Sequence, residues 1–228
     1  MKTDSDYISP RLGGLGPKLA WKIRSKIFTN LMRTLQPTSN WKVLDAGVTS
    51  DRTPDSNFFE RLYPYKSMIV AVGLEDASFL EQEYPGVTFY RANACNLPFD
   101  DKTFDLAFCS AVIEHVGQRQ NQLTLLRELT RVSRIAVVTT PNRYFPIEFH
   151  TLTPFLHWLP PSIFRSFLKL TGRNFFADEQ NLNLLSERDL NKLIQEAGLF
   201  AKTQHEHLLG IKSNLVYYIS RDEEIGKM

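Results

Sequence analysis

The sequence predicts an α/β protein with an open, doubly wound and mostly parallel β-sheet that carries helices on both faces. Short apolar segments rich in β-branched and aromatic residues alternate with helical segments from residue 41 onward, which is the pattern of βαβ units. Several of the apolar segments have no polar face, as expected of parallel strands that helices cover on both sides. Together the two observations indicate a sheet of the doubly wound type.

Five strands and three helices are expected in the first part of this alternation, because turn residues bound each apolar segment. The strands are expected at Val43–Ala46, Met68–Val72, Val87–Tyr90, Phe104–Phe108 and Ile135–Val138. The helices are expected at about 56–63, 77–83 and 120–132. The last of them has Leu123, Leu126 and Leu129 at helical spacing, with charges on the opposite face.

The C-terminal part predicts one more helix and two more strands. The helix is expected at 186–197, with Ser186 as its N-cap, Asp189 three residues later and Gly198 just after its end. The strands are expected at Phe200–His207 and Leu215–Ser220. Because no helical crossover separates these two segments, they predict an antiparallel hairpin at one edge of the sheet.

The chain is expected to divide into an N-terminal arm with a capping helix, residues 1–40, and a main domain, residues 41–228. The capping helix is expected at Pro17–Leu35, where Leu and Ile recur four residues apart. An insertion at about 142–185, rich in aromatic residues and proline, is expected to form short helices over the carboxyl ends of the strands. Its rings are interpreted first as an acceptor pocket, then as a satellite core, and third as a peripheral membrane contact.

The composition is that of an ordinary globular protein, with 43% hydrophobic and 23% charged residues. The net charge of +2 is too small to indicate a nucleic-acid partner. Cys95 and Cys109 are too few for a disulfide framework, and no apolar segment is long enough to span a bilayer. The N-terminus shows no signal-peptide pattern. We therefore expect a cytoplasmic protein. The sequence indicates no metal site, and it leaves the oligomeric state open.

Two predicted strands end in residues suited to a nucleoside ligand. The first ends in Asp45-Ala46-Gly47, and a small residue with a glycine there lets the backbone approach a ligand, although a tight turn alone also explains one glycine. The second is followed by Glu75 and Asp76. A carboxylate at that place can accept the hydroxyl protons of a ribose, or it can stabilise the N-terminus of the next helix. We assign Glu75 to the ribose and Asp76 to the helix.

The third and fourth strands supply a more specific pattern. RANACNLPF, from Arg91 to Phe99, is followed by DDKTFDLAFCSAVIEHV. Asn93 in the first of these stretches is suited to hydrogen-bond the exocyclic amine of adenine. Together with VLDAG, GLED and the TTPN after the fifth strand, this order of motifs resembles the class I S-adenosylmethionine-dependent methyltransferases. Within them, it is similar to the small-molecule group that includes the ubiquinone and menaquinone methyltransferases.

The resemblance implies a Rossmann-like sheet of seven strands with an antiparallel last strand, and S-adenosylmethionine as methyl donor. The donor-binding positions that it implies are Asp45, Gly47, Glu75, Asn93, Ala94, Ser110 and Ala111. Asp45 and Gly47 match the positions that hold the methionine end. Glu75 matches the ribose-binding acid, and Asn93 and Ala94 match the positions that contact adenine. The resemblance also places a histidine, His115, at the start of the helix that follows the fourth strand.

Two positions depart from the family pattern. The family usually has two further glycines after Gly47, where this chain has Val48-Thr49-Ser50-Asp51. A side chain at Thr49 must leave room for the donor, or the loop must follow another path. Asn93 stands where the family usually has Asp, so the position loses a charge but keeps an acceptor oxygen.

Histidines are the candidate catalytic groups, because methyl transfer to a hydroxyl benefits from a general base that titrates near neutral pH. His115 follows the fourth strand, close to where the methyl group is expected, and His150 lies in the insertion on the acceptor side. His157 is a third candidate. Each of the three is also suited to a structural role, such as a bond to a backbone carbonyl. His205 and His207 are expected at the surface.

The leading hypothesis is methyl transfer to a small-molecule acceptor that is lipid-linked, quinone-like or a saccharide, with O-methylation favoured. The alternative is a methyltransferase-like binding module without catalysis, which the altered glycine loop supports. A nicotinamide-dependent oxidoreductase comes third, because the first loop lacks the three-glycine pattern. Gly13 to Gly16 follow no strand and are interpreted as a flexible arm, and Tyr7, Arg11 and Trp21 are candidates to fold over the donor site.

Overall fold

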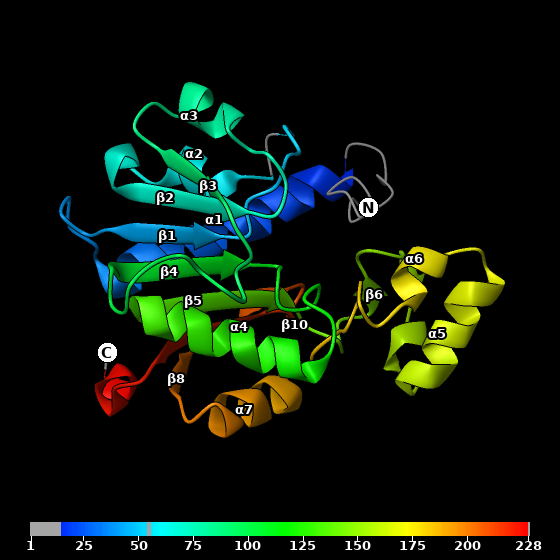
Figure 1. Cartoon of the computed structure of the whole chain (residues 1–228). Helices are drawn as coiled ribbons and strands as arrows, with labels where there is room; N and C mark the ends of the chain where they lie inside the picture. Colours follow the sequence, from blue (N-terminus) through cyan, green and yellow to red (C-terminus); the bar gives the residue numbers. More distant parts are fainter. Residues whose placement is uncertain (1–14, 54–55, 228) are drawn as a thin grey trace.

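The computed structural model describes residues 15–53 and 56–227 (Figure 1). Its centre is one β-sheet, whose main path runs β3-β2-β1-β4-β5-β10-β8, with β9 paired to β10. The strands are β1 (Val43–Ala46), β2 (Ile69–Gly73), β3 (Thr88–Arg91), β4 (Phe104–Ser110), β5 (Ser133–Pro141), β8 (Phe200–Thr203), β9 (Glu206–Leu208) and β10 (Ile211–Ser220). β1 to β5 are parallel, whereas β10 is antiparallel to β5 and β8. The predicted fold class is confirmed.

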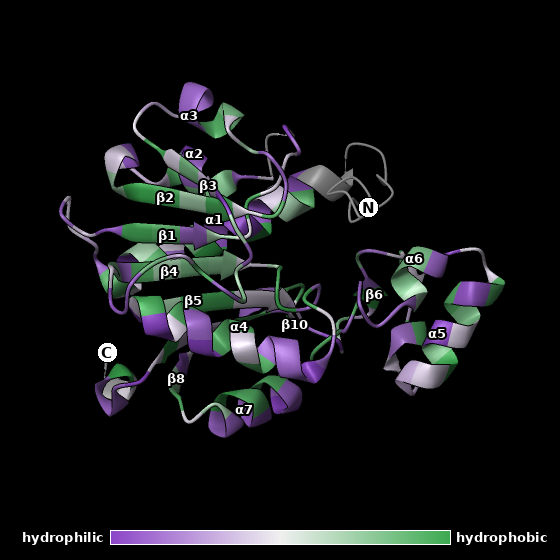
Figure 2. Ribbon diagram, viewed as in Figure 1, coloured by the Kyte–Doolittle hydropathy of each residue, from purple (hydrophilic) through white to green (hydrophobic). Residues whose placement is uncertain are grey.

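Helices cover both faces of this sheet. Residues of α1 (Leu15–Leu35), α2 (Phe58–Leu62) and α3 (Phe79–Glu83) pack in the core on one face, and residues of α4 (Arg119–Val132) and α7 (Glu187–Glu196) pack in the core on the other. Two short 3₁₀ helices, η2 (Lys66–Met68) and η4 (Glu223–Lys227), join this body. Figure 2 shows the hydrophobic strands between helices whose outer faces are hydrophilic, as burial of an amphipathic helix requires.

The alternation of side chains along β1 divides its residues between the two cores. Leu44 and Ala46 lie in the core under α4 and α7, whereas Val43 lies in the core under α1 and α2. Because alternate residues of a strand share a face, Asp45 points to the same side as Val43. On α1, Ile27 and Leu31 of the predicted apolar stripe are buried, so this helix packs on the sheet.

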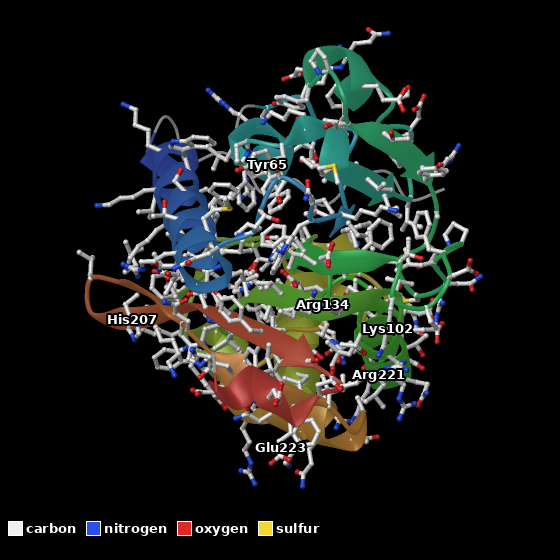
Figure 3. The ribbon with its side chains drawn as sticks, turned by 90° about the vertical axis from the view of Figure 1, so that its left-hand side faces the viewer. Tyr65, Lys102, Arg134, His207, Arg221 and Glu223 are labelled. Carbon is white, nitrogen blue, oxygen red and sulfur yellow. The ribbon has the colours of Figure 1, made fainter. Side chains whose placement is uncertain are left out.

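The end of the sheet differs from the prediction in one respect. The segment expected as a single strand at 200–207 forms two short strands, β8 and β9, with His205 between them. The Nδ1 of His205 accepts the N–H of Val216 at 3.2 Å, and its Nε2 lies 3.1 Å from Oε1 of Glu187. The prediction of a surface position is therefore wrong for His205, because these two contacts hold its side chain between β10 and α7. His207 is exposed on the β9–β10 hairpin (Figure 3).

Residues 142–185, which we call the insertion lobe, lie beyond the carboxyl ends of the parallel strands (Figure 1). The lobe contains β6 (Ile147–Glu148), β7 (Thr153–Pro154), η3 (Leu156–Trp158), α5 (Pro161–Leu170) and α6 (Asn174–Ala177). Phe164, Leu168 and Ala177 form a small core of its own. The opposite end of the sheet, seen in Figure 3, carries Lys102 and Arg134. Among the helices of the described residues, none has the length and apolar composition to cross a membrane.

Candidate active site

The carboxyl ends of β1, β2 and β4 converge at the sheet edge that faces the insertion lobe (Figure 1). The N–H groups of Gly47 and Val48 both donate to the carbonyl of Val72, at 2.7 and 3.0 Å. A Cβ on Gly73 would lie 2.5 Å from the carbonyl oxygen of Val48, and one on Gly47 would lie 2.1 Å from a methyl group of Val112. Gly47 also has a φ of +111°, a backbone conformation that residues with a side chain rarely adopt. Close contacts between loops therefore explain both glycines.

The loop after Gly47 is held by side-chain hydrogen bonds where the family has further glycines. The amide of Asn57 accepts the N–H of Thr49 and donates to its carbonyl, both at 3.0 Å. The hydroxyl of Thr49 accepts the N–H of Asp51 at 3.1 Å. The loop thus follows a turn of its own, which accommodates the side chain at Thr49. Within it, the hydroxyl of Ser50 donates to Oε2 of Glu75 at 2.8 Å.

The two carboxylates after β2 have different surroundings. Asp76 is exposed and accepts the N–H of Ser78 at 2.9 Å, at the start of α3. This bond lowers the pKa of Asp76. Asp76 therefore takes the helix-stabilising part that the sequence assigned to it. Glu75 is half-buried and bonded to the β1 loop, so it is the carboxylate that the structure places at the sheet edge.

The predicted adenine-binding residues lie in the turn after β3. Asn93 is exposed, and its Oδ1 accepts the N–H of Cys95 at 2.9 Å. Ala94 is buried. The turn is short, because the carbonyl of Asn93 accepts the N–H of Asn96 at 2.8 Å. Since β3 is the neighbour of β2, Asn93 and Glu75 belong to adjacent strand ends.

Ser110 and Ala111 make a strained turn at the end of β4. The N–H of Ala111 donates to the carbonyl of Thr139 at 2.8 Å, and the hydroxyls of Ser110 and Thr139 are 2.9 Å apart. Ala111 has a φ of +55°, a conformation that costs energy for a residue with a Cβ. Such strain is concentrated at functional sites, and here it turns the chain sharply away from the sheet edge.

Asp45 lies against a second buried carboxyl group, that of Glu60 on α2. Asp45 is 7% exposed and Glu60 is fully buried. Burial raises the pKa of Asp45 well above its ordinary value, and the neighbouring Glu60 raises it further. Burial also raises the pKa of Glu60. The structure therefore places Asp45 in a pair of carboxyl groups beneath the β1 loop.

His115 and His150 meet in a chain of hydrogen bonds that is half-buried at His115 and buried at His150. Their Nε2 atoms are 3.1 Å apart, and their rings are edge to face. Nδ1 of His115 donates to the carbonyl of Asn181 at 2.7 Å. Nδ1 of His150 lies 2.7 Å from Oε1 of Glu148. Thr151 donates to Oε2 of Glu148 through both its N–H and its hydroxyl, at 2.6 and 2.5 Å. The two sequence-predicted catalytic residues are thus brought together.

Burial and charge act in opposite directions in this chain of bonds. Burial alone would raise the pKa of Glu148, but the charge and hydrogen bonds of His150 lower it to about 2. Burial likewise disfavours the charged form of His150, yet the carboxylate of Glu148 outweighs it and raises the pKa of His150. Burial and the neighbouring His150 lower the pKa of His115 to about 3. His150 is therefore the member of the pair that carries a proton most readily.

The sequence reasoning overlooked Glu114, which completes this group. Glu114 is fully buried, and its Oε2 accepts the hydroxyl of Thr140 at 2.8 Å. Its carbonyl accepts the N–H of Asn183 at 2.7 Å, which joins the β4 end to the insertion lobe. Burial raises the pKa of Glu114. A glutamate beside His115 at the end of a buried strand was the available signal, since charged residues are seldom fully buried.

The other predicted candidates lie elsewhere. Nε2 of His157 bonds the carbonyl of Phe145 at 2.8 Å, which is the structural role considered for it. The ring of Trp21 on α1 lies 4.8 Å from the guanidinium of Arg61. Tyr7 and Arg11 lie outside the described residues. Cys95 and Cys109 are free thiols.

Comparisons with known proteins agree with this fold. Residues 60–136 match a family model described as a methyltransferase domain. No curated protein matches the sequence. A structure from Thermotoga maritima, titled a possible histamine N-methyltransferase, is 18% identical with a TM-score of 0.54, over 90% of this chain and 92% of that one.

Two further similar structures contain S-adenosylhomocysteine. Magnesium protoporphyrin IX methyltransferase from Synechocystis is 12% identical with a TM-score of 0.58, over 96% of this chain and 92% of that one. The 1,6-didemethyltoxoflavin N1-methyltransferase from Burkholderia thailandensis is 15% identical with a TM-score of 0.56, over 91% and 78%. Residues 60–136 thus match a methyltransferase domain, and the chain as a whole shares the fold of these S-adenosylmethionine-dependent methyltransferases.

Proposed function

We propose that the chain is an S-adenosylmethionine-dependent methyltransferase and that it acts on a hydroxyl group of a small molecule that lies beside His115 and His150. One observation carries the proposal: an imidazole from the end of β4 and one from the insertion lobe meet with their Nε2 atoms 3.1 Å apart. The β4 end is a donor-side position and the lobe an acceptor-side position. The pair therefore marks the place where the methyl group and its acceptor come together.

The residues at the sheet edge fit the donor by their chemistry. Glu75 supplies a carboxylate, and two carboxylate oxygens can accept several hydrogen bonds, so the bond from Ser50 leaves capacity for ribose hydroxyls. We assign Asn93 and Ala94 to adenine, Ser110 and Ala111 to the wall at the end of β4, and Gly47 to the methionine end. Asp45 sits below Gly47 and is assigned to holding the β1 loop in place through its contact with Glu60.

When bound, S-adenosylmethionine supplies a methyl group on a sulfonium, which is displaced in line by the acceptor. The protein's own contribution is geometry and proton removal. His115 and His150 present ring nitrogens that can take the hydroxyl proton, and Glu148 fixes the orientation of the His150 ring. Burial of His150, which is 8% exposed, keeps the reacting region from bulk water.

Aromatic rings around the pair support an acceptor with a ring or an apolar chain, such as a quinone-like or lipid-linked molecule. The ring of Phe176 lies 5.7 Å from that of His150, and Phe149 stacks on Phe145 at 5.3 Å. Exposed aromatic residues, Tyr144 and Trp158, continue this surface on the lobe. Aromatic faces of this kind bind flat or apolar ligands.

The donor assignment is tested by calorimetric titration with S-adenosylhomocysteine. We expect the full chain to bind it, and we expect Glu75→Gln to bind at least about 10-fold more weakly, because a hydrogen bond to a charged group contributes about 1.5–3 kcal/mol. Asp76→Asn is the matched control, since Asp76 is the neighbouring exposed carboxylate bonded to α3. Equal weakening by both variants would contradict the assignment of Glu75.

The acceptor is tested by transfer of labelled methyl to a panel of phenols, quinols, isoprenoid alcohols and sugars. We expect label on oxygen in at least one apolar or ring-containing member, and we expect His150→Ala to lose that transfer while retaining S-adenosylhomocysteine binding. Label on nitrogen or carbon alone would overturn O-methylation. Failure to bind S-adenosylhomocysteine at all would instead favour a binding module without catalysis.

A further inference from the structure

We propose that Glu114, His115 and His150 bind one divalent transition-metal ion, with Zn²⁺ as the best-suited species. One ligand atom of each residue lies within 4.8 Å of the ligand atoms of the other two. Glu114 and His115 follow β4, and His150 comes from the insertion lobe, so the ion would join the two parts of the molecule. The action of the ion on an acceptor rests on the proposed function, but its binding does not.

The hydrogen bonds around the two histidines set the tautomer that metal binding needs. Nδ1 of His115 must carry a hydrogen, because its partner is a backbone carbonyl, and the carboxylate of Glu148 makes the same demand on Nδ1 of His150. In the neutral rings, each Nε2 atom then carries a lone pair, and the two Nε2 atoms are 3.1 Å apart. Two such acceptors are held together either by a proton that one ring donates to the other or by a metal ion bound to both. A carbonyl or carboxylate on the far ring nitrogen is the usual support of a metal-binding histidine.

The spacing of the two nitrogens also suits a shared ion. Ligand nitrogens about 2.0–2.1 Å from Zn²⁺ lie roughly 3.0–3.4 Å from each other when they occupy adjacent positions. The observed 3.1 Å falls in that range.

Glu114 supplies an independent observation. Its side chain is fully buried, and Thr140 holds Oε2. Among the described residues, no hydrogen-bond donor reaches Oε1. A buried carboxylate oxygen without a partner is costly, and a metal ion in contact with this group removes that cost.

The charge of the cluster points the same way. Glu114 and Glu148 place two carboxyl groups in the interior, and the ion pairs of the described residues give Glu148 one partner, His150, and Glu114 none. No described lysine or arginine forms an ion pair with either. A divalent cation would balance two carboxylates, which one protonated imidazole cannot do.

The ligand set favours Zn²⁺ over the harder cations. Two imidazoles and one carboxylate are a common set for catalytic zinc, which keeps its fourth position open, whereas Ca²⁺ and Mg²⁺ prefer oxygen ligands throughout. In the open position the ion would hold the acceptor's oxygen. With both imidazoles bound to it, the ion would take over from a free histidine in favouring loss of the hydroxyl proton to solvent, and the oxygen would keep the electron pair that forms the bond to the methyl carbon as the carbon–sulfur bond of the donor breaks.

The test uses the full chain without any methyl donor. The protein is freed of metal with a chelator, desalted, and titrated with Zn²⁺ by calorimetry and with Co²⁺ by visible absorption. We expect one ion per chain and d–d bands of a low-coordinate site with nitrogen and oxygen ligands. A wild-type chain that binds neither ion stoichiometrically would overturn the proposal.

Variants locate the site. We expect His150→Ala and Glu114→Gln to weaken binding at least about 100-fold, and Glu148→Gln to weaken it about 10–100-fold through the outer shell. His157→Gln is the matched control, because His157 is a buried histidine of the same lobe bonded to the carbonyl of Phe145, and it should bind as the wild type does. Thermal unfolding without metal shows which variants remain folded.

The outcomes separate this proposal from the proposed function. Stoichiometric binding that His150→Ala leaves unchanged would place the ion elsewhere and overturn the site. Metal binding in a chain that does not bind S-adenosylhomocysteine would leave the metal site standing and remove the methyl-transfer function. Donor binding and methyl transfer that persist in a metal-free chain would leave the proposed function standing and remove the role of the ion in it.

Discussion

Some single residues in this protein are buried ionisable groups, and the free energy that their ionisation costs must be offset by the rest of the fold. Asp45 and Glu60 are the clearest case, because burial raises the pKa of both carboxyl groups and Glu60 raises that of Asp45 further. A folded chain that holds protons more tightly than the unfolded chain is most stable at low pH and loses stability as pH rises. The pair therefore ties stability to protonation beneath the β1 loop.

Glu60→Gln tests this cost. The neutral amide can donate to Asp45, so we expect the variant to be more stable than the wild type at pH 8, by about 1 kcal/mol or more. The wild type loses this stability as pH rises from the unfolded-state values near 4 toward the raised folded-state values, and the gap between the two proteins should close below pH 4. Urea unfolding across pH measures it. Glu223→Gln, on an exposed residue (Figure 3), serves as control and should show no such gap.

At the scale of elements, the loop after β1 and the loop after β4 approach each other closely because Gly47 has no side chain. A Cβ on Gly47 would overlap a methyl group of Val112, so the close approach of the two loops depends on glycine. In the proposed assignment, the two loops carry opposite parts of the donor site. Their fit therefore links the methionine end of the donor to the wall formed by Ser110 and Ala111.

Gly47→Ala should cost more than backbone strain alone. Gly210 has a φ of +79° with no atom near its absent Cβ, whereas Gly47 has a φ of +111° and the overlap at 2.1 Å. We expect Gly210→Ala to lose about 1 kcal/mol and Gly47→Ala to lose about 2–4 kcal/mol in urea unfolding. The double variant Gly47→Ala with Val112→Ala should recover part of the loss. Equal losses for the two single variants would show that the contact with Val112 is unimportant.

Elements governed by local signals were predictable from the sequence. Ser186 and Asp189 form the reciprocal hydrogen bonds of a capping box at the start of α7, as the spacing of the two residues indicates. The break between β8 and β9 was not predictable. It arises because His205 bonds Val216 and Glu187, which are remote in sequence. Alternation of apolar and polar residues cannot reveal that a side chain will accept a hydrogen bond from the backbone of another strand.

The candidate site divides in the same way. Asp76 follows from its position before a helix, and His115 and His150 were singled out as chemistry-bearing residues. Their meeting depends on how the insertion lobe folds back over the sheet, and no periodicity encodes that. Glu114 was missed because its importance lies in burial, which the sequence does not show. The absence of a nucleic-acid partner, the peripheral membrane contact and the cytoplasmic location stay predictions from the sequence.

At the scale of the whole molecule, the insertion lobe and the sheet body differ in how much core holds them. The core of the lobe is three buried residues, Phe164, Leu168 and Ala177, whereas the two cores on either side of the sheet are far larger. Regions with few buried apolar contacts open more readily. The lobe is thus expected to move as a unit against a firm sheet, which suits an acceptor that must enter and leave.

Hydrogen exchange measures this difference. We expect amides of α5 to exchange at least about 100-fold faster than those of β4 and β5, because the lobe can open without unfolding the sheet. Helix α4 packs on the large core and is the control for helical structure alone; it should exchange slowly. Exchange of α4 and α5 at the same rate would show that the lobe and the sheet open together.

The place of β10 has a consequence for how the chain matures. β10 is the last strand in sequence, yet it lies between β5 and β8, where Leu215 pairs with Thr140 and Tyr218 pairs with Lys202. Until residues 211–220 leave the ribosome, both neighbouring strands present open edges, and such edges are sites of aggregation. We infer that the nascent chain passes through a stage in which the donor half of the sheet is complete while the other half still needs protection from other chains.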